Sequence, residues 1–512
     1  MFSTQLYDDL YTYFHKEYFL PGQRQIIEDV LAGKDVLGIL PTGSGKSLCY
    51  QFPAKKLSGT TIVVSPLISL MTDQVKQLKA THFKEVIALN SFIDPLERKK
   101  VYPHLATYKL IYVSPELLQQ KEAMYWLKKI TISLFVVDEA HCISQWGHEF
   151  RPDYLRLRKV ISDFGHPGIL ALSATATKEV RKDIMHHLGT PKMEQHIYPI
   201  DRKNIIYDIK KRNGDKEKTT YVATIIRTYH IPIVIYFSSR QTCQEIADFL
   251  SKTIPDRQIA YYHGGMEQID RTLIQQQFMN DQIDVVCATS AFGMGINKQN
   301  IRMVIHYHLP AQLESFIQET GRAGRDGNSS VSLLLYSDSD KYIPKGFIKR
   351  ELPPLAKLSY IWNKLADLYA NDLPIPKNDK EIDHCFHLSQ TQWRFLFYHM
   401  TKHGMIREGN IIYDKQHWQK VLYNIKSVIS RRMKQKENKL DEMMEWISED
   451  GCLRKKLFEG FQSTYTIPDG HCCSNCGFQY TNWKPILTET KKGTKPWDDI
   501  LRKILLGNDQ TQ

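Results

Sequence analysis

Nine short apolar runs constrain the fold of this chain more than any other feature. Five lie between residues 35 and 175 (VLGIL, TIVVS, LIYVS, LFVVDEA and ILALSA), and four lie beyond residue 230 (IVIYFSS, QIDVVCATS, MVIHYHLP and VSLLLYS). Each is rich in Val, Ile and Leu, and amphipathic stretches separate them. This rhythm is typical of buried parallel strands joined by helices. It predicts two doubly wound α/β units, the second opening near residue 200.

The length and composition of the chain exclude a protein with a single core and a protein that spans a membrane. The chain has 512 residues, which is too long for one core, and its 42% hydrophobic and 24% charged residues are ordinary for a soluble protein. No run reaches the ~18 apolar residues of a membrane span, and the N-terminus lacks a signal-peptide layout. We expect a cytoplasmic protein with no membrane partner. The net charge of +12 suits a polyanionic partner but is modest for this length.

The stretch ILPTGSGKSLCYQFP (residues 39–53) is expected to form a strand, a glycine-containing loop and a helix starting at Gly45. A loop that wraps phosphates needs glycines to turn its N–H groups inward, a lysine for the β/γ-phosphates and a hydroxyl for Mg²⁺. The helix adds its N-terminal dipole. One departure is Leu40, which stands where the usual pattern has its first glycine. The predicted phosphate site consists of Thr42, Gly43, Ser44, Gly45, Lys46 and Ser47.

The run VVDEAH, about 90 residues after the loop, supplies two adjacent carboxylates at a strand end. Asp138 is predicted to hold the Mg²⁺ ion, and Glu139 to orient or deprotonate the attacking water. Phosphoryl transfer asks a protein mainly for positioning and charge stabilisation, which these groups provide. Two carboxylates alone would be a weak signal, but following a phosphate loop they indicate catalysis.

The segment QETGRAGRDG adds cations from the second α/β unit. Arg322 and Arg325 are three residues apart, so we expect both on one helical face. A fixed, planar cation can reach a γ-phosphate across a cleft between domains. The alternative is that both are ordinary surface arginines.

Directly behind the acidic pair, HCISQWGHEFRPDY gathers aromatic and charged residues within fourteen positions. A plain surface loop has no need of such a cluster. Trp146 and Phe150 offer faces on which bases can stack, and Arg151 can contact a phosphate or a carboxylate. The alternative is that Trp146 and Phe150 close the core of the domain.

Beyond Ser337 the chain is richer in helix formers. Residues 387–414 are expected to form a helix, a glycine turn and a short hairpin, the outline of a winged helix. A helical hairpin that merely packs on the core is the alternative. A long amphipathic helix is then predicted up to residue 447.

Four of the nine cysteines lie between residues 452 and 476. A Cys₄ zinc site commonly contains a C-x-x-C knuckle, which Cys473 and Cys476 make, with Cys452 as the distant ligand. The fourth ligand is open at this point: Cys472 is adjacent to Cys473, and His471 is an alternative. The remaining cysteines, scattered singly, indicate reduced thiols.

These motifs together resemble the RecQ family of DNA helicases in helicase superfamily 2. The matching pieces are FLPGQ, PTGSGKS, SPLISLMTDQV, VSPELL, DEAHCISQWGHEFRPDY, LSATAT, YFSSR, YHGGM, CATSAFGMGINK and QETGRAGRDG, in family order over about residues 15–330. DEAH alone would not separate this family from RNA helicases, but the SQWGHEFRPDY continuation does. Departures are Leu20 and Leu453, where arginine is usual, and Glu149, where aspartate is usual.

The resemblance implies an ATP-dependent, Mg²⁺-requiring 3′-to-5′ DNA helicase in repair or recombination. It implies two RecA-like domains, with residues 1–200 as domain 1 and residues 201–340 as domain 2. It assigns adenine recognition to Gln23, and DNA sensing coupled to hydrolysis to an aromatic-rich loop. In that loop the residues concerned are Trp146, His148, Phe150 and Arg151. Single-stranded and partly duplex DNA are the expected partners. The sequence identifies no protein partner and is compatible with a monomer.

The rest of the chain resembles a short bacterial form of the family. We expect a helical region with the candidate winged helix at residues 341–425, a helix with the zinc module at 426–485, and a tail at 486–512. Only 36 residues follow Cys476, too few for the winged helix that follows zinc in longer members. The candidate winged helix precedes the zinc module instead, so the accessory order is unusual.

Two other functions fit the same fold. An RNA helicase would use 2′-OH contacts, and matched DNA and RNA strands would separate the two activities. A binding module that has lost catalysis is disfavoured by the intact Lys46, Asp138, Glu139 and Arg325.

Overall fold

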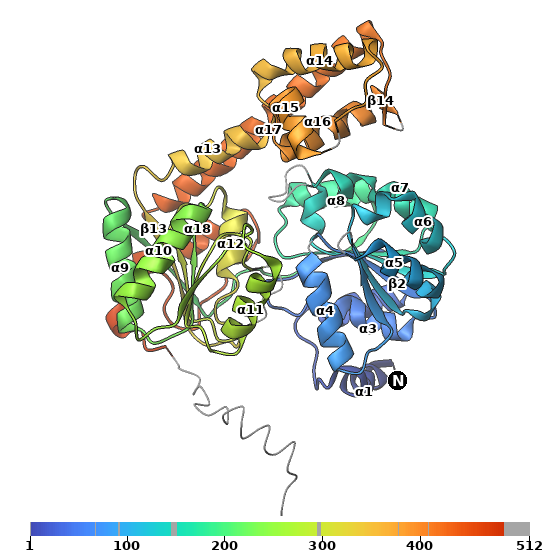
Figure 1. Cartoon of the computed structure of the whole chain (residues 1–512). Coiled ribbons are helices and arrows are strands. Elements are labelled where there is room, and N and C mark those ends of the chain that lie inside the picture. Colours follow the sequence, from blue (N-terminus) through green and yellow to red (C-terminus); the bar gives the residue numbers. More distant parts are fainter. Residues whose placement is uncertain are drawn as a thin grey trace, which may run out of the picture.

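Two parallel sheets form the body of the molecule in the computed structural model (Figure 1). The structure describes residues 2–66, 68–90, 93–144, 151–293, 298–376, 378–407 and 409–485. The first sheet has the strand order β3-β4-β2-β5-β6-β1-β7, and the second has the order β10-β11-β9-β12-β13-β8. Their pairings are parallel. The two predicted α/β units are therefore confirmed as two RecA-like domains.

The strands of the first sheet are β1 (Val36–Ile39), β2 (Thr60–Val64), β3 (Val86–Leu89), β4 (Leu110–Val113), β5 (Ile132–Val137), β6 (Gly168–Ser173) and β7 (Glu194–Ile197). Those of the second sheet are β8 (Ile205–Lys211), β9 (Ile233–Tyr236), β10 (Ile259–Tyr262), β11 (Val285–Ala288), β12 (Met303–His306) and β13 (Ser330–Tyr336). Each of the nine apolar runs contains one of these strands. Within these nine runs the strand side chains are mostly buried on both faces, because helices cover both sides of each sheet.

The helices of domain 1 are α1 (Phe2–Phe14), α2 (Gln23–Leu31), α3 (Leu48–Lys56), α4 (Ile68–Ala80), α5 (Pro95–Val101), α6 (Lys121–Leu127), α7 (Leu157–Asp163) and α8 (Lys178–Leu188). Domain 2 has α9 (Gly214–Thr228), α10 (Arg240–Thr253), α11 (Gln268–Met279) and α12 (Leu313–Thr320). The remaining α-helices are α13 (Tyr342–Glu351), α14 (Leu358–Ala370), α15 (Asp379–Phe386), α16 (Gln390–Lys402), α17 (Lys415–Ile447) and α18 (Leu453–Phe458). None of the helices in the described ranges is both long and apolar enough to cross a membrane.

The strand order brings three parts of the sequence together at the carboxyl ends of neighbouring strands in the first sheet. In the order β5-β6-β1, the acidic pair follows β5, the SAT segment (residues 173–175) lies at the end of β6, and the phosphate loop follows β1. Ligands of open α/β sheets bind outside the carboxyl ends of the strands. The topology therefore gathers the predicted catalytic residues of domain 1 at one place.

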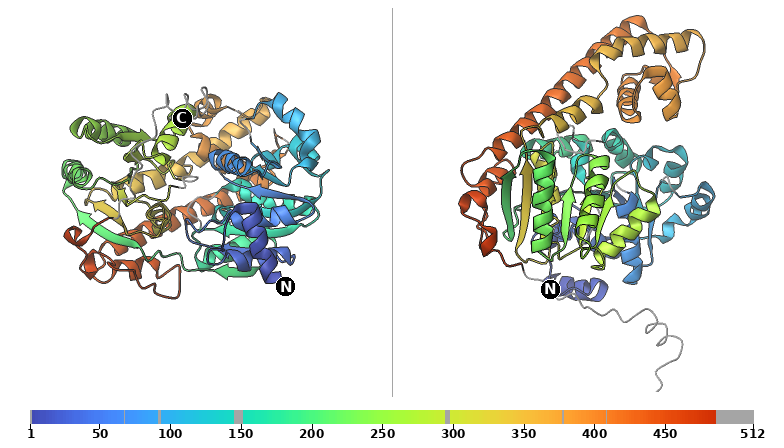
Figure 2. Two further views of the ribbon diagram at one scale, coloured as in Figure 1. Left: turned by 90° about the horizontal axis from the view of Figure 1, so that it is seen from below. Right: turned by 60° about the vertical axis from the view of Figure 1, so that its left-hand side comes forward.

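A separate helical region is joined to the sheet domains by α13 and α17, which run side by side (Figure 2). Helix α17 has 33 residues and is about 50 Å long. Its first half packs in the core of the helical region through Trp418, Ile425 and Ile429. Its second half packs on domain 2, where Trp446 lies against Phe316 with ring centres 4.6 Å apart. The predicted long helix is confirmed, and it runs across the expected boundary at residue 425.

The predicted helix, glycine turn and hairpin are present in the helical region. A capping box of Ser389 and Gln392 starts α16. Gly404, with a φ of 76°, ends it in the left-handed conformation that favours glycine. An antiparallel hairpin, β14 (Ile406–Arg407) and β15 (Asn410–Ile411), follows. Strands of two residues do not by themselves make a winged helix, so that assignment stays a prediction.

A buried histidine in the helical region predicts loss of stability in acid. His399 on α16 packs against Phe395, with ring centres 4.6 Å apart, and burial lowers the pKa of His399 to about 4. The unfolded residue titrates near 6.5. Between these two pKa values His399 is protonated in the unfolded chain but neutral in the folded chain. The free energy of unfolding therefore falls as the pH drops through this range. From pH 7 to pH 5 the expected loss is about 2 kcal/mol.

Chemical denaturation at both pH values checks this prediction. His399→Phe should reduce the pH dependence by that amount, because the phenylalanine carries no titrating group. His384→Phe, at an exposed histidine of the same region, serves as the control and should behave like the parent. Equal pH dependence in the parent and in His399→Phe would contradict the assignment.

Candidate functional site

The phosphate loop lies between β1 and α3. Gly43 and Gly45 have φ values of 86° and 65°, in the left-handed region that favours glycine. Helix α3 starts at Leu48 rather than at Gly45. That prediction was wrong, because a left-handed Gly45 cannot belong to a right-handed helix. The Ser44 hydroxyl is buried and makes no hydrogen bond within the described part of the chain, which fits a loop that binds phosphate.

Gln23 fixes the phosphate loop from the adjoining helix α2. Its Nε2 donates to the carbonyl oxygens of Ser44 at 2.7 Å and Gly45 at 3.0 Å. Its Oε1 accepts from the Leu20 N–H at 2.9 Å. The amide therefore connects the FLPGQ segment to the loop, and its predicted contact with the adenine edge stays a prediction.

Leu40 replaces the glycine of the usual pattern, and Gly22 makes room for it. The Leu40 side chain is fully buried. A Cβ atom at Gly22 would lie 2.6 Å from Leu40 Cδ2, closer than two non-bonded carbon atoms approach in a protein. The missing side chain at position 22 thus accommodates the extra side chain at position 40.

The acidic pair follows β5 and faces Lys46. The Glu139 Oε1 atom lies 3.7 Å from the Lys46 Nζ atom. Burial, and next the repulsion from Glu139, raise the pKa of Asp138 to about 7. A buried carboxylate beside a second carboxylate is stabilised by a cation, so the pair has the donor chemistry that Mg²⁺ prefers. Phosphate loop, lysine and carboxylates are brought together as predicted.

His141 connects the acidic pair to the SAT segment. Its Nδ1 atom lies 3.3 Å from Glu139 Oε2 and 3.0 Å from the Ser173 hydroxyl. Ser173 in turn donates to the Thr175 carbonyl at 3.2 Å. Because β5 and β6 are neighbours, this contact forms at the carboxyl edge of the sheet. These contacts connect Glu139 to residues 173–175.

The segment after the acidic pair is fixed at both of its ends. The Arg151 N–H donates to the Cys142 carbonyl at 3.0 Å. The Tyr154 hydroxyl donates to the Asp138 carbonyl at 3.3 Å, and Tyr154 is fully buried. Trp146, His148 and Phe150 lie outside the described residues, so their predicted roles stay predictions. Arg151 is half-buried, 3.9 Å from the Glu116 carboxylate.

The two predicted arginines lie in a turn, not on a helical face. Helix α12 ends at Thr320, and residues 321–326 form turns, where Gly324 has a φ of 54° that a right-handed helix does not allow. Arg322 is buried and donates to the Gly293 carbonyl. Arg325 points to domain 1, where a Cβ atom at Gly43 would lie 3.1 Å from Arg325 Cγ. The prediction of one shared helical face was therefore wrong, and the two side chains have different surroundings.

The domains meet closely where this turn contacts the phosphate loop. A Cβ atom at Gly321 would lie 2.9 Å from Thr42 Cβ, so the absence of a side chain permits the approach. A second contact joins α4 to α11, where Gln275 Nε2 donates to Asp73 Oδ2 at 3.0 Å. The site is therefore built from both RecA-like domains.

The cysteine cluster has the geometry of a metal site. The sulfur atoms of Cys452, Cys472, Cys473 and Cys476 all lie within 4.8 Å of one another. Cys452 and Cys472 are 3.6 Å apart, close to the ~3.8 Å edge of a tetrahedron with Zn–S bonds of about 2.3 Å. His471 instead packs on Phe478, with ring centres 5.6 Å apart. The geometry thus favours Cys472 over His471 as the fourth ligand.

Two arginines that stabilise the arrangement of these segments were not predicted from the sequence. Arg202 donates to the carbonyl oxygens of Gly321 and Ala323 at 3.1 and 2.9 Å, which fixes the arginine turn. Arg454 is fully buried and pairs with Asp201 at 2.5 Å, which ties α18 to the start of domain 2. No motif marks either residue, since their partners are backbone groups or lie about 250 residues away.

Known proteins match this chain over both sheet domains. Residues 20–183 match the family model "DEAD/DEAH box helicase" and residues 217–327 match "Helicase conserved C-terminal domain". The probable ATP-dependent DNA helicase RecS of Bacillus subtilis is 40% identical over 504 residues, which cover 98% of both chains. The ATP-dependent DNA helicase RecQ of Pasteurella multocida is 42% identical over 65% of this chain, which spans 52% of that relative.

Solved structures share the fold at low sequence identity. The helicase Lhr of Mycobacterium smegmatis, bound to single-stranded DNA and AMP-PNP, aligns with a TM-score of 0.57 and 17% identity, covering 80% of this chain and 59% of Lhr. Mss116p bound to single-stranded RNA and AMP-PNP aligns with a TM-score of 0.56 and 15% identity, covering 84% and 89%. The shared architecture is thus found in proteins that bind either nucleic acid.

Proposed function

Because this chain belongs to the RecQ family of ATP-dependent DNA helicases, we propose that it couples ATP hydrolysis to 3′-to-5′ movement on single-stranded DNA. This movement unwinds partly duplex DNA in repair and recombination. The observation that carries the proposal is the packing of Arg325, from domain 2, against Gly43 of the phosphate loop in domain 1. A site completed only when two domains meet can convert hydrolysis into relative motion of the domains.

Five side chains of the site and the N–H groups of the phosphate loop have proposed roles in this reaction. Lys46 and the loop N–H groups bind the phosphates of ATP, while Ser47 and Asp138 would hold Mg²⁺, which neutralises phosphate charge when bound. Glu139, now 3.7 Å from Lys46, orients the attacking water and accepts its proton. Arg325 stabilises the charge that develops on the γ-phosphate.

Coupling to DNA is proposed to pass through the segment that follows the acidic pair. The aromatic-rich loop, residues 145–150, binds single-stranded DNA through Trp146, His148 and Phe150, with Arg151 at its end. Tyr154 then transmits the position of the loop to Asp138, because its hydroxyl contacts the Asp138 carbonyl. Ordering of the loop would in this way set the geometry of the acidic pair.

We also infer that Cys452, Cys472, Cys473 and Cys476 hold one structural Zn²⁺ ion. All four are sulfur ligands with mutual distances that fit a tetrahedral site. We further propose that the protein is located in the bacterial cytoplasm and associates with the nucleoid, where the DNA substrates are found. It is proposed to act as a monomer.

The proposal is tested by ATP hydrolysis with and without single-stranded DNA, in the parent and in Trp146→Ala. Strong stimulation that collapses in the variant, with DNA binding largely kept, is the expected result. A matched RNA strand is the third condition and should stimulate weakly. Stimulation by RNA but not by DNA would replace the proposal with an RNA-dependent activity.

Removing one hydroxyl tests the coupling route. Tyr154→Phe is expected to lower DNA-stimulated ATP hydrolysis about fivefold, since a hydrogen bond of ~1 kcal/mol corresponds to that factor in rate. Single-stranded DNA affinity should be unchanged, and this is measured by fluorescence anisotropy. Tyr102→Phe, at another buried tyrosine of domain 1, is the control and should behave like the parent. Equal stimulation in all three proteins would exclude Tyr154 from the coupling route.

A further inference from the structure

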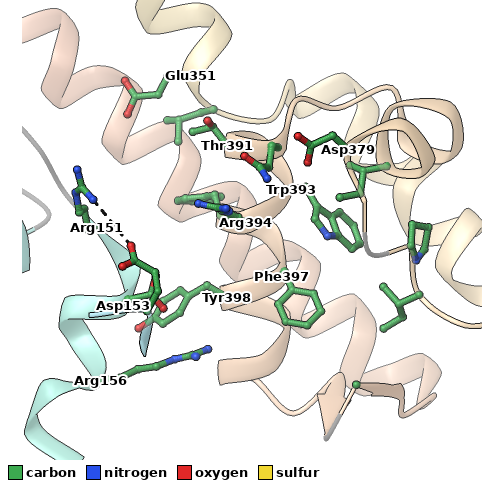
Figure 3. A pocket seen from close by; sticks show the side chains of 18 of the residues that line it. Arg151, Asp153, Arg156, Glu351, Asp379, Thr391, Trp393, Arg394, Phe397 and Tyr398 are labelled. Atoms are coloured by element: carbon green, nitrogen blue, oxygen red, sulfur yellow. Dashed lines mark ion pairs between the residues drawn. The ribbon is translucent and has the colours of Figure 1, made fainter. Parts of the chain in front are cut away.

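The cleft between the helical region and domain 1 has balanced charges (Figure 3). Four arginines and four carboxylates are among the described residues that line it. Arg151 lies 3.9 Å from the Glu116 carboxylate, and Arg432 lies 3.6 Å from the Glu351 carboxylate. Because the two kinds of charge cancel, this cleft does not favour a polyanion. A basic surface without matching carboxylates lies on helix α17.

Helix α17 carries its charges in two separate blocks. The 22 residues from Lys415 to Lys436, here called the basic block, include seven lysines and arginines and no aspartate or glutamate. The next eleven residues, up to Ile447, include four carboxylates and one lysine. A helix is stabilised by acidic residues in its first turn and basic residues in its last, and apart from the N-cap Asp414, α17 has neither. Helix stability therefore does not explain the basic block.

The cations of α17 divide into a paired and an unpaired group. Arg432 and Lys436 contact the Glu351 carboxylate of α13 at 3.6 and 2.5 Å. Lys439 pairs with Glu314 of α12. The other cations of the basic block make no ion pair within the described ranges; they are Lys415, Lys420, Lys426, Arg431 and Lys434. Five positive charges are thus left without a carboxylate of this chain.

Three of these unpaired cations form a row on one face of the helix. Lys420 and Arg431 are eleven residues apart, which is three helical turns, and Lys434 lies one turn further on. All three are exposed, and they span about 21 Å. The opposite face, with Ile425 and Ile429, is buried in the core of the helical region. The row therefore faces solvent along the arm that joins the helical region to domain 2 (Figure 2).

The exposed side chains of this row all suit a phosphate backbone. Between Lys420 and Lys434 they are those of Tyr423, Asn424, Ser427, Ser430 and Arg431. Lysine, arginine, serine, asparagine and tyrosine are side chains that contact the phosphate oxygens of DNA. This described stretch contains no carboxylate and exposes no aliphatic side chain, whereas a helix that lies on a membrane exposes an apolar face. The composition therefore favours a nucleic acid.

The shape of the surface favours a duplex over a single strand. Sites for single strands combine a basic groove with several aromatic side chains on which bases stack. This surface is instead the convex side of one helix, and Tyr423 is its one exposed aromatic residue between residues 420 and 434. A row of ~21 Å covers about six base pairs at 3.4 Å each, and the major groove, ~12 Å wide, admits a helix.

We propose that the exposed face of α17 from Lys420 to Lys434 binds the phosphate backbone of duplex DNA. The contacts are electrostatic, so the binding is independent of base sequence and weakens as salt is added. Because α17 also packs on domain 2 through Trp446, the duplex would be held by the same arm that domain 2 carries. This inference rests on the proposed function, which supplies partly duplex DNA as the ligand.

Neutralising the row tests the site. A variant that combines Lys420→Gln, Arg431→Gln and Lys434→Gln should bind a blunt duplex of about 20 base pairs at least tenfold more weakly, because three phosphate contacts are lost. The slope of log affinity against log salt should decrease by about three, one for each lost cation. Fluorescence anisotropy at several salt concentrations measures both quantities. ATP hydrolysis stimulated by single-stranded DNA should be unchanged, because the row lies outside the ATP site.

A matched variant removes three charges elsewhere. Lys99→Gln, Lys216→Gln and Lys252→Gln change exposed residues of α5, α9 and α10. This control should keep the duplex affinity within about twofold of the parent, since charges further away than ~8–10 Å are largely screened. Single substitutions at positions 420, 431 and 434 should each lower the salt slope by about one, which keeps the test valid if the combined variant unfolds. Unfolding temperatures show whether each variant is folded.

The outcomes separate this surface from the proposed function. If the combined variant and the parent bind the duplex equally, or if the control loses as much affinity, the assignment to α17 is overturned and the helicase proposal stands. An equal loss of affinity for single-stranded DNA would overturn the assignment to a duplex. A parent that is stimulated by single-stranded DNA but does not bind the duplex would also overturn it, and the surface would then fit an acidic protein. A parent that neither binds nor responds to any DNA overturns both proposals.

Discussion

Replacing Arg325 by alanine is expected to lower DNA-stimulated ATP hydrolysis by about 10³–10⁵-fold, the range found for arginine fingers. Arg325 is the cation of domain 2 that packs against Gly43. Burial, and next the repulsion from Arg322 and Arg202, lower the pKa of Arg325 to about 9, so the side chain is still charged at pH 7. An arriving γ-phosphate relieves this repulsion, most strongly when its charge grows in the transition state.

The affinity for ATP separates this effect from simple loss of binding. Arg325→Ala should bind a fluorescent ATP analogue within about tenfold of the parent, since an interaction made mainly in the transition state lowers kcat. Arg227→Ala is the control, because Arg227 lies on the surface of α9 and contacts the Thr253 carbonyl. A variant at position 325 that keeps more than a tenth of the parent rate would exclude Arg325 as the finger.

Loss of one cluster sulfur is expected to cost the protein its zinc and much of its C-terminal structure. We predict about one zinc ion per parent chain and none in Cys452→Ser, because three sulfur ligands bind far more weakly than four. The cluster holds residues 472–476 beside β8, where the Tyr207 N–H donates to the Cys472 carbonyl at 3.2 Å. We expect the unfolding temperature of this part to fall by about 10 °C or more.

Metal analysis and thermal unfolding of the same samples test this prediction. Cys385→Ser is the matched control, because Cys385 is a half-buried thiol on α15 outside the cluster, and it should keep both the zinc and the stability. A chelator should reproduce the effect of Cys452→Ser in the parent. Unchanged zinc content in Cys452→Ser would show that the metal is bound elsewhere.

The sequence predicted the inner strands but not the outer ones. All nine apolar runs became strands, whereas β3, β7, β8 and β10 were not recognised. These four are the edges of the two sheets. An edge strand has one unpaired side and more solvent contact, so its residues need less hydrophobicity; β7, with the sequence EQHI, is mostly exposed. An inner strand can be predicted from the sequence because burial on both faces requires a continuous run of hydrophobic residues.

Within the site, local motifs were predictable and contacts between distant segments were not. The phosphate loop and acidic pair each lie in one short stretch, so their chemistry follows from residue types and spacing. Spacing alone did not show that α12 ends before Arg322, that Gly22 accommodates Leu40, or that His471 packs on Phe478. Each depends on which segments meet in three dimensions.

Strand separation tests the central claim most directly. A short DNA duplex with a 3′ single-stranded tail is mixed with the parent or with Lys46→Ala, with ATP or with a non-hydrolysable analogue. We predict that only the parent with ATP separates the strands, and that a duplex with a 5′ tail stays paired. Failure of the parent on the 3′-tailed duplex, or equal separation by Lys46→Ala, would contradict the account.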